Sequence, residues 1–203
     1  MQIGKILKQT RSESKPHPEN TTDFPASLLR YHPEITATWG QTSPALFSAM
    51  KAAFRTDRWP WYIHGAAGTG KTCAAACLYQ CWPGAEEPGP RSPWWIDSQR
   101  FMPELARLRA DGKLSAVKNS LEACPLVILD DIATRDLTGP QMDAMLYLLN
   151  IRCKRPLIVT CNFSPAALSS IMDDRIVSRV SAGVVIEVTG EDRRVSQSVE
   201  IKA

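Results

Sequence analysis

Short apolar runs and longer stretches of helical periodicity alternate along this chain. The apolar runs occupy residues 61–64, 94–97, 126–131, 157–160 and 184–188, and each has the length of a single β-strand. Helical patterns occupy residues 43–54 and 71–82, a segment that begins near residue 98, and residues 140–152 and 165–171. Strands that alternate with helices predict an α/β fold, in which helices cover both faces of a parallel sheet.

A glycine-rich loop joins the first predicted strand to the helix that follows it. Its sequence, GAAGTGKT, consists of Gly65, Ala66, Ala67, Gly68, Thr69, Gly70, Lys71 and Thr72. A polyphosphate needs backbone N–H groups that point inward, and glycines let the backbone wrap closely enough to supply them. We expect Lys71 to bridge the outer phosphates, Thr72 to ligate magnesium, and the helix N-terminus to add its dipole. The loop therefore predicts nucleotide binding.

Two adjacent acids end the third predicted strand. The run LVILDDI is apolar up to Asp130 and Asp131, as in a strand that is buried on both faces. Ligands gather at the carboxyl ends of such strands. We expect Asp130 to hold the metal ion and Asp131 to orient the attacking water. The alternative is that both acids only cap the next segment or face solvent.

Asn162 follows the fourth predicted strand. If that strand lies between the strands that carry the loop and the acids, the Asn162 amide can touch the attacking water and the outermost phosphate. Asn162 would then position water and sense phosphate. It also stands just before Phe163, Ser164 and Pro165, so a plain helix-capping turn is the alternative.

Composition suggests one domain with extensions. The 203 residues are 44% hydrophobic, and we divide them into an N-terminal arm and linker (1–42), partly disordered and a candidate for partner binding, an ATPase domain (43–194) and a C-terminal tail (195–203). A net charge of +3 means that any nucleic-acid contact must come from a local patch. No apolar run approaches the roughly 20 residues of a membrane-spanning helix, and the N-terminus lacks a secretion signal, so we expect a soluble, cytoplasmic protein.

The order of motifs resembles one family. GAAGTGKT, LVILDDI, LIVTCNFSPAAL, DRIVSRV and VIEVTGEDRR follow one another as in DnaC/IstB-type AAA+ ATPases, over about residues 59–194. The resemblance implies a P-loop NTPase core of the AAA+ type with a five-stranded parallel sheet, ATP and Mg²⁺ as cofactors, and the roles given above for the acids and for Asn162. We expect no helical lid domain after Val195, where larger AAA+ proteins have one.

Arg175 and Arg179 lie four residues apart in DRIVSRV and share a face of the predicted helix. From the residues alone, a solvated helix whose arginines pair with Asp173 and Asp174 is the simpler interpretation. The resemblance implies instead that an arginine here completes the active site of a neighbouring subunit. An arginine that acts in trans needs a head-to-tail interface, so we expect self-assembly into a spiral or ring.

The resemblance also implies partners. Its members load a replicative helicase of the DnaB type onto single-stranded DNA or, in the transposon-encoded branch, assist a transposase. The amphipathic segment 98–118 carries the basic residues that we expect to contact DNA, namely Arg100, Arg107, Arg109, Lys113 and Lys118. The alternative is a solvated helix face that is balanced by Asp97, Glu104 and Asp111.

We therefore expect an ATP-hydrolysing helicase loader that acts in DNA replication. An IstB-like transposition helper is one alternative. A nucleotide-dependent DNA-binding module with little hydrolysis is another, because Asp131 is shorter than the glutamate found in many relatives. A small-molecule kinase would need an arginine-rich lid and an acceptor pocket, and neither is evident between residues 82 and 126.

Overall fold

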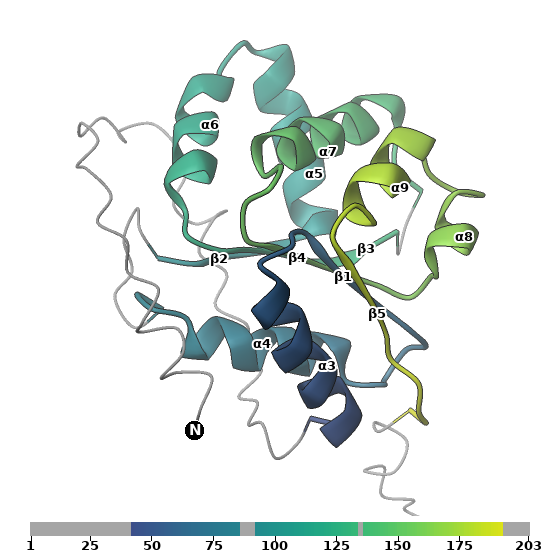
Figure 1. The fold of residues 1–203 in the computed structure, drawn as a ribbon. Helices are drawn as coiled ribbons and strands as arrows, with labels where there is room; N and C mark the ends of the chain where they lie inside the picture. Colours follow the sequence, from purple (N-terminus) through teal and green to yellow (C-terminus); the bar gives the residue numbers. More distant parts are fainter. Residues whose placement is uncertain (1–41, 86–91, 134–135, 193–203) are drawn as a thin grey trace, which may run out of the picture.

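A five-stranded parallel sheet forms the centre of the molecule (Figure 1). The computed structural model describes residues 42–85, 92–133 and 136–192; nearly all of the expected arm, the tail, and Arg193 and Arg194 of the last motif lie outside these residues. The strands are β1 (Trp61–His64), β2 (Trp94–Asp97), β3 (Val127–Ile132), β4 (Leu157–Cys161) and β5 (Val184–Glu187). Their order is β2-β3-β4-β1-β5, which confirms the predicted fold class. It also places β4 between the strands of the acids and the loop.

Helices cover both faces of this sheet (Figure 1). One face carries α3 (Pro44–Thr56) and α4 (Lys71–Cys81). The other face carries α5 (Ser98–Ala110), α6 (Leu114–Ala123), α7 (Gly139–Ile151) and α9 (Asp174–Val180). The short helix α8 (Pro165–Leu168) follows β4 at the side of the sheet where the strands end.

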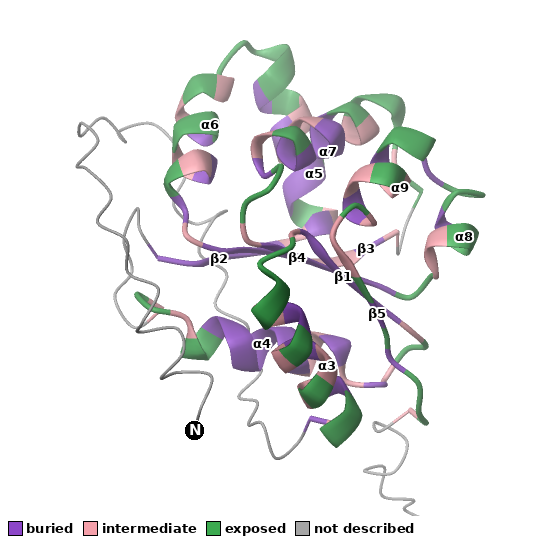
Figure 2. Ribbon diagram, in the orientation of Figure 1, coloured by how far each residue is buried: buried purple, intermediate pink, exposed green. Residues whose placement is uncertain are grey.

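The sheet separates two apolar cores, as β1 illustrates. Trp61 and Ile63 belong to the core beneath α3 and α4, whereas Tyr62 between them belongs to the core beneath α5, α7 and α9. Side chains of successive strand residues point to opposite faces, so one short strand serves both layers. Strands β1 to β4 are largely buried, whereas β5 at the edge of the sheet has only Ile186 buried, and the outer sides of the helices are exposed (Figure 2).

Two predicted helices differ from those observed. The segment 98–118 is not one helix, because Gly112 ends α5 in a left-handed conformation (φ 70°) and Lys113 N donates to Leu108 O at 2.9 Å. The helix predicted at 165–171 stops at Leu168, after which Ser170 N and Ile171 N each donate to the carbonyl three residues earlier. The basic residues of 98–118 are therefore divided between two helices and the turn that joins them.

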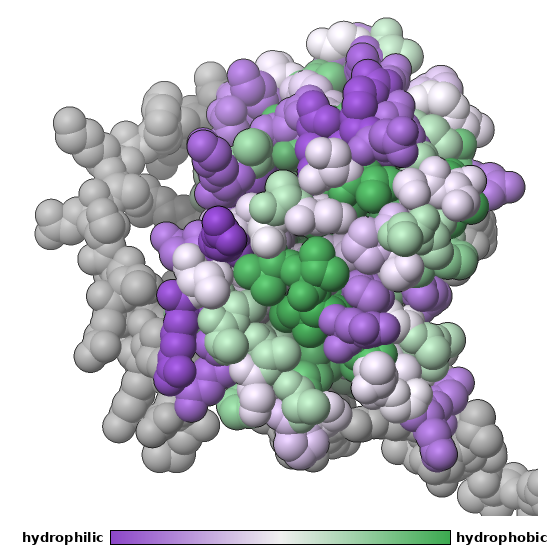
Figure 3. All heavy atoms as spheres, turned by 45° about the vertical axis from the view of Figure 1, so that its right-hand side comes forward, coloured by the Kyte–Doolittle hydropathy of each residue, from purple (hydrophilic) through white to green (hydrophobic). Residues whose placement is uncertain are grey.

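The surface has a hydrophobic area on the side that comes forward in Figure 3, and hydrophilic residues border it. In the described part of the chain, the exposed large hydrophobic residues are Phe163, Ile171 and Val185. Within the same residues, no helix is long and apolar enough to cross a membrane.

Candidate functional site

The glycine-rich loop lies between the end of β1 and the start of α4. Gly70 caps α4 with a positive φ of 96° and with no side-chain hydrogen bond to the first turn, so the backbone N–H groups of that turn face the loop. Lys71 is buried, and its Nζ donates to Gly65 O at 2.8 Å and to Ala66 O at 2.7 Å. The ammonium group is therefore held at the loop itself, together with the positive end of a helix dipole. This arrangement suits an anion.

The chain that follows β5 crosses the beginning of this loop. Val188 N donates to His64 O at 2.7 Å, and a Cβ at Gly65 would lie 2.1 Å from Val188 O. A Cβ at Gly68 would lie 1.7 Å from Oδ1 of Asp192. The backbone contact at Gly65 requires glycine, whereas the Asp192 side chain near Gly68 could turn away; both positions have a positive φ, which favours glycine. The sequence identifies the VIEVTGEDRR motif but does not predict that its Val188 and Asp192 contact the glycine-rich loop.

Asp130 joins three elements at the carboxyl end of β3. Its Oδ1 accepts hydrogen bonds from Thr72 Oγ1 on α4, at 3.1 Å, and from Thr160 Oγ1 on β4, at 2.6 Å. Burial raises the pKa of Asp130 to about 6, and the two hydroxyl hydrogen bonds oppose that rise. Thr72 and Asp130 are thus brought together as predicted. Sequence reasoning gave Thr160 no role, because its partner lies on another strand.

Oxygen atoms converge here in the way that a magnesium ion requires. Mg²⁺ takes oxygen ligands, usually one or two from the protein together with substrate phosphates. A bound cation would also reduce the cost of holding the Asp130 charge in a buried position. The hydroxyl of Thr72 and the carboxylate of Asp130 therefore fit such an ion.

Asp131 follows in a bent part of β3. Its backbone is left-handed (φ 57°), and the pairing of β3 with β4 shifts register between Leu129 and Ile132. Asp131 N donates to Thr160 Oγ1 at 2.8 Å, and Asp131 O accepts from Ser98 Oγ at 2.8 Å. A residue held in this unusual conformation from both sides is typical of a functional position.

Asn162 is exposed in the turn directly after β4, at the same edge of the sheet as the loop and the acids. The cap of α8 is Ser164, whose Oγ accepts from Ala167 N at 3.3 Å. Asn162 therefore does not itself cap α8, although it lies in the turn that leads to the cap.

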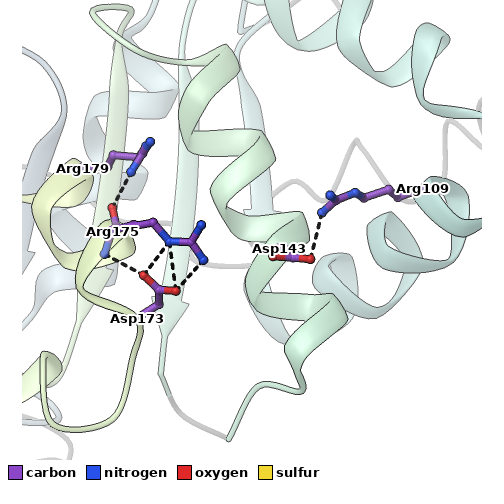
Figure 4. Close-up of polar contacts among 5 residues, drawn as sticks. All are labelled: Arg109, Asp143, Asp173, Arg175 and Arg179. Carbon is purple, nitrogen blue, oxygen red and sulfur yellow. Dashed lines mark hydrogen bonds and ion pairs between the residues drawn. The ribbon is translucent and has the colours of Figure 1, made fainter.

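Arg175 and Arg179 both lie on α9 but have different partners (Figure 4). Arg175 forms a two-pronged ion pair with Asp173, with Nη2 at 2.7 Å from Oδ2, and this pairing lowers the pKa of Asp173 to about 2. Arg179 donates from Nε to Asn150 Oδ1 at 2.6 Å and from Nη1 to Arg175 O at 3.0 Å. The expected pairing with acids thus holds for Arg175, whereas both of these acceptors of Arg179 are neutral.

The basic residues expected to bind DNA are mostly paired with acids. Arg100 lies 3.8 Å from Asp97, Arg107 contacts Glu104 and Asp111, and Arg109 lies 3.5 Å from Asp143 of α7 (Figure 4). Lys113 is exposed in the turn before α6. These residues, and both arginines of α9, lie in the helical layer on the face opposite α4 (Figure 1). The structure does not bring them to this chain's own phosphate loop.

The strand order, with the glycine-rich loop at the end of β1, is that of the AAA+ fold that the motifs predict. A family model described as the bacterial DnaA ATPase domain matches residues 42–187, and the chain belongs to this family. The family shown is therefore that of the DnaA ATPase domain. The expected DnaC/IstB family is supported only as far as the AAA+ class that it shares with DnaA.

Curated relatives are chromosomal replication initiator proteins DnaA. That of Rhodopseudomonas palustris (strain TIE-1) is 31% identical over 141 residues, and that of Bradyrhizobium sp. (strain BTAi1) is 29% identical over 140 residues. Each alignment covers 66% of this chain and 28% of the relative. The chain therefore spans less than a third of the length of these relatives.

Solved structures share the fold at low sequence identity. A DnaA bound to AMPPCP and single-stranded DNA has a TM-score of 0.60 at 20% identity, covering 75% of this chain and 48% of that one. The DnaC helicase loader has a TM-score of 0.59 at 18% identity, covering 74% of this chain and 98% of that one. The structure of DnaI has a TM-score of 0.58 at 22% identity, and the match covers 78% of this chain and 91% of that one.

Proposed function

We propose that this chain binds and hydrolyses ATP and that it uses this cycle to load a replicative helicase onto single-stranded DNA. The observation that carries the ATPase part is the junction at Asp130, where hydroxyls from α4 and β4 meet the carboxylate beside the glycine-rich loop. Membership of the DnaA ATPase domain family supports the same activity.

The phosphates of ATP would lie in the loop of residues 65–72, against the N–H groups at the start of α4. Lys71 would exchange its two carbonyl acceptors for the outer phosphates, because a hydrogen bond to a charged acceptor is stronger. Thr72 and Asp130 would hold Mg²⁺, which when bound neutralises part of the phosphate charge.

Hydrolysis would take place between β3 and β4. A water molecule bonds to the terminal phosphorus while the bond from that phosphorus to ADP breaks, and Asp131 orients the water and accepts its proton. Asn162, on the turn after the neighbouring strand, would contact both the water and the terminal phosphate.

The arginine supplied to a neighbouring subunit would be Arg179. Arg175 already shares its charge with Asp173, so moving it to a phosphate means breaking a two-pronged pair. Arg179 is held by an amide oxygen and a backbone carbonyl, which orient the guanidinium without neutralising it. Its position away from the chain's own loop supports action in trans, in a spiral or ring.

The partner part of the proposal rests on the motif order and on relatives that are replication initiators. The single strand would contact Arg100, Arg107, Arg109 and Lys113, with the arginines exchanging carboxylates for DNA phosphates. Pull-down with a replicative helicase and, in parallel, with a transposase tests this part. Capture of the transposase alone would favour the IstB-like alternative.

Asp131→Asn tests the hydrolysis step. We expect ATP binding to remain and turnover to fall about a hundredfold, because the amide cannot accept the proton from water. Asp136→Asn, which changes an exposed acid just beyond the same strand, is the matched control and should keep wild-type turnover. If Asp131→Asn turns over ATP like the wild type, Asp131 has no such role. If neither protein hydrolyses ATP, the chain is a binding module.

A further inference from the structure

The turn that carries Asn162 is tied to the strands on both sides of β4. Before Asn162, Cys161 Sγ donates to Ile132 O of β3 at 3.3 Å. After it, the hydroxyl of Tyr62 on β1 donates to Phe163 O at 2.7 Å. Phe163 N also donates to Cys161 Sγ at 3.4 Å, which closes the turn upon itself. The residues on either side of Asn162 are therefore fixed, while Asn162 itself is exposed.

Tyr62 and Cys161 are both fully buried, with exposed fractions of 0%. Burial raises the pKa of the Tyr62 hydroxyl far above neutrality, and burial also raises the pKa of the Cys161 thiol. Both groups thus keep their protons at neutral pH and can act as donors. Titration of these groups therefore does not break either hydrogen bond near neutral pH.

The hydroxyl of Tyr62 is not needed for packing. The ring lies in the apolar core with Val159 and Cys161 of β4, where a phenylalanine ring would occupy the same space. A buried hydroxyl costs free energy unless it finds a hydrogen-bond partner. Here the partner is a backbone carbonyl 101 residues away, immediately after Asn162.

We infer that Tyr62 is a positioning residue that aims Asn162 at the terminal phosphate of ATP. The inference rests on the phosphate-sensing role proposed for Asn162. β1 then links two parts of the site, because it carries the Tyr62 hydroxyl and leads three residues later into the glycine-rich loop at Gly65. Without the hydroxyl, the Asn162 turn loses its tether to β1 but keeps the Cys161 tether to β3.

The consequence concerns the discrimination between ATP and ADP. The proposed contact of Asn162 is with the γ-phosphate, which ADP lacks, so a displaced Asn162 weakens binding of an ATP analogue and leaves ADP binding unaffected. A hydroxyl that served only stability would lower the melting temperature and leave the ratio of the two affinities unchanged. This ratio therefore separates positioning from a merely structural role.

The experiment compares Tyr62→Phe with Tyr79→Phe, which removes the hydroxyl of another buried tyrosine, on α4 in the opposite core. Calorimetric titration with AMPPCP and with ADP, both with Mg²⁺, measures the two affinities. We expect Tyr62→Phe to weaken AMPPCP binding about threefold to tenfold, as the loss of one hydrogen bond implies, with ADP binding unchanged. Tyr79→Phe should match the wild type for both nucleotides.

Asn162→Ala, alone and combined with Tyr62→Phe, completes the test. If Tyr62 acts through Asn162, the double variant binds AMPPCP no more weakly than Asn162→Ala alone. The inference would be overturned if Asn162→Ala lost affinity for AMPPCP relative to ADP while Tyr62→Phe kept the wild-type ratio of these two affinities. The proposed function would then remain intact. An unchanged ratio in Asn162→Ala would overturn the proposed role of Asn162, and the inference with it.

Discussion

At the scale of single residues, neutral hydrogen-bond partners distinguish Arg179 and Asp130 from Arg175. Arg179 is held by an amide and a carbonyl oxygen, and Asp130 by two hydroxyls. Arg175 is held by a carboxylate. A charge that is oriented by neutral dipoles still acts on a ligand, whereas an ion pair largely cancels its own field.

Thr160 provides the first prediction at this scale. Thr160→Val removes a buried hydroxyl that serves both Asp130 Oδ1 and Asp131 N. We expect the free energy of unfolding to fall by about 1–3 kcal/mol, because two buried polar groups lose a partner. Urea denaturation measures this change, and Thr160→Ser, which retains the hydroxyl, is the control. Equal stability of the valine and serine variants would show that these hydrogen bonds contribute little.

His64 provides a prediction on pH. Burial lowers the pKa of His64 below its ordinary value of 6.5, although nearby Glu187 partly opposes this. The unfolded chain therefore binds a proton at a higher pH than the folded chain, so His64 lowers stability as pH falls through 6.5 and below. We expect His64→Gln to lose less stability than the wild type between pH 8 and pH 5.5 in urea denaturation. The other titrating groups are the same in the wild type and in His64→Gln. An equal loss of unfolding free energy in both proteins would contradict the role given to His64.

At the scale of elements, the chain after β5 and the glycine-rich loop constrain each other. Val188 O lies only 2.1 Å from the place of a Cβ at Gly65, so the loop can follow its course only with glycine at that position. The hydrogen bond from Val188 N to His64 O holds the two segments together. The last strand thus supports the loop from the side opposite β4, since β1 lies between β4 and β5.

Alanine substitutions at two glycines of the loop can distinguish the cost of a steric clash from the cost of backbone strain. Gly65→Ala brings a Cβ to 2.1 Å from a backbone oxygen, whereas Gly70→Ala meets nothing within 4 Å; both residues have positive φ angles, of 152° and 96°. We expect Gly70→Ala to cost about 1–2 kcal/mol of unfolding free energy. Gly65→Ala should cost clearly more, because the backbone of Val188 must move. Chemical denaturation without nucleotide measures both, and equal losses would argue against the close approach.

At the scale of the whole molecule, the sheet places the phosphate loop and Arg179 in different layers. The loop leads into α4 on one face, and α9, the helix of Arg179, lies on the other (Figure 1). The proposed head-to-tail assembly would bring the arginine of one copy to the loop of the next. A single chain would then hydrolyse ATP slowly.

Much of this arrangement could be predicted from the sequence, because local patterns encode it. The strand of Asp130 and Asp131 was predicted within one residue, since continuous apolar runs mark strands that are buried on both faces. The break between α5 and α6 has a local signal as well, in Gly112, which the helical periodicity obscured. The pairing of Arg175 with Asp173 was also predictable, because the two residues are close in the sequence.

Contacts between distant segments could not be predicted. Tyr62 reaches a carbonyl 101 residues away, Thr160 reaches Asp130 on another strand, and Asp192 reaches Gly68 across the loop. Nothing near these residues in the sequence identifies their partners, because the partners are set by strand order and register. The types of residue at the site were therefore predictable, but the network that positions them required the structure.

The binding of MgATP at the glycine-rich loop is tested most directly by calorimetric titration of the wild type and of Lys71→Ala with AMPPCP and Mg²⁺. The account predicts saturable binding by the wild type and a loss of at least about tenfold in Lys71→Ala, which removes a charge-assisted contact to the phosphates. Lys118→Ala, which removes an exposed lysine of α6, should bind like the wild type. Absence of binding by the wild type, or equal affinity in Lys71→Ala, would contradict the account.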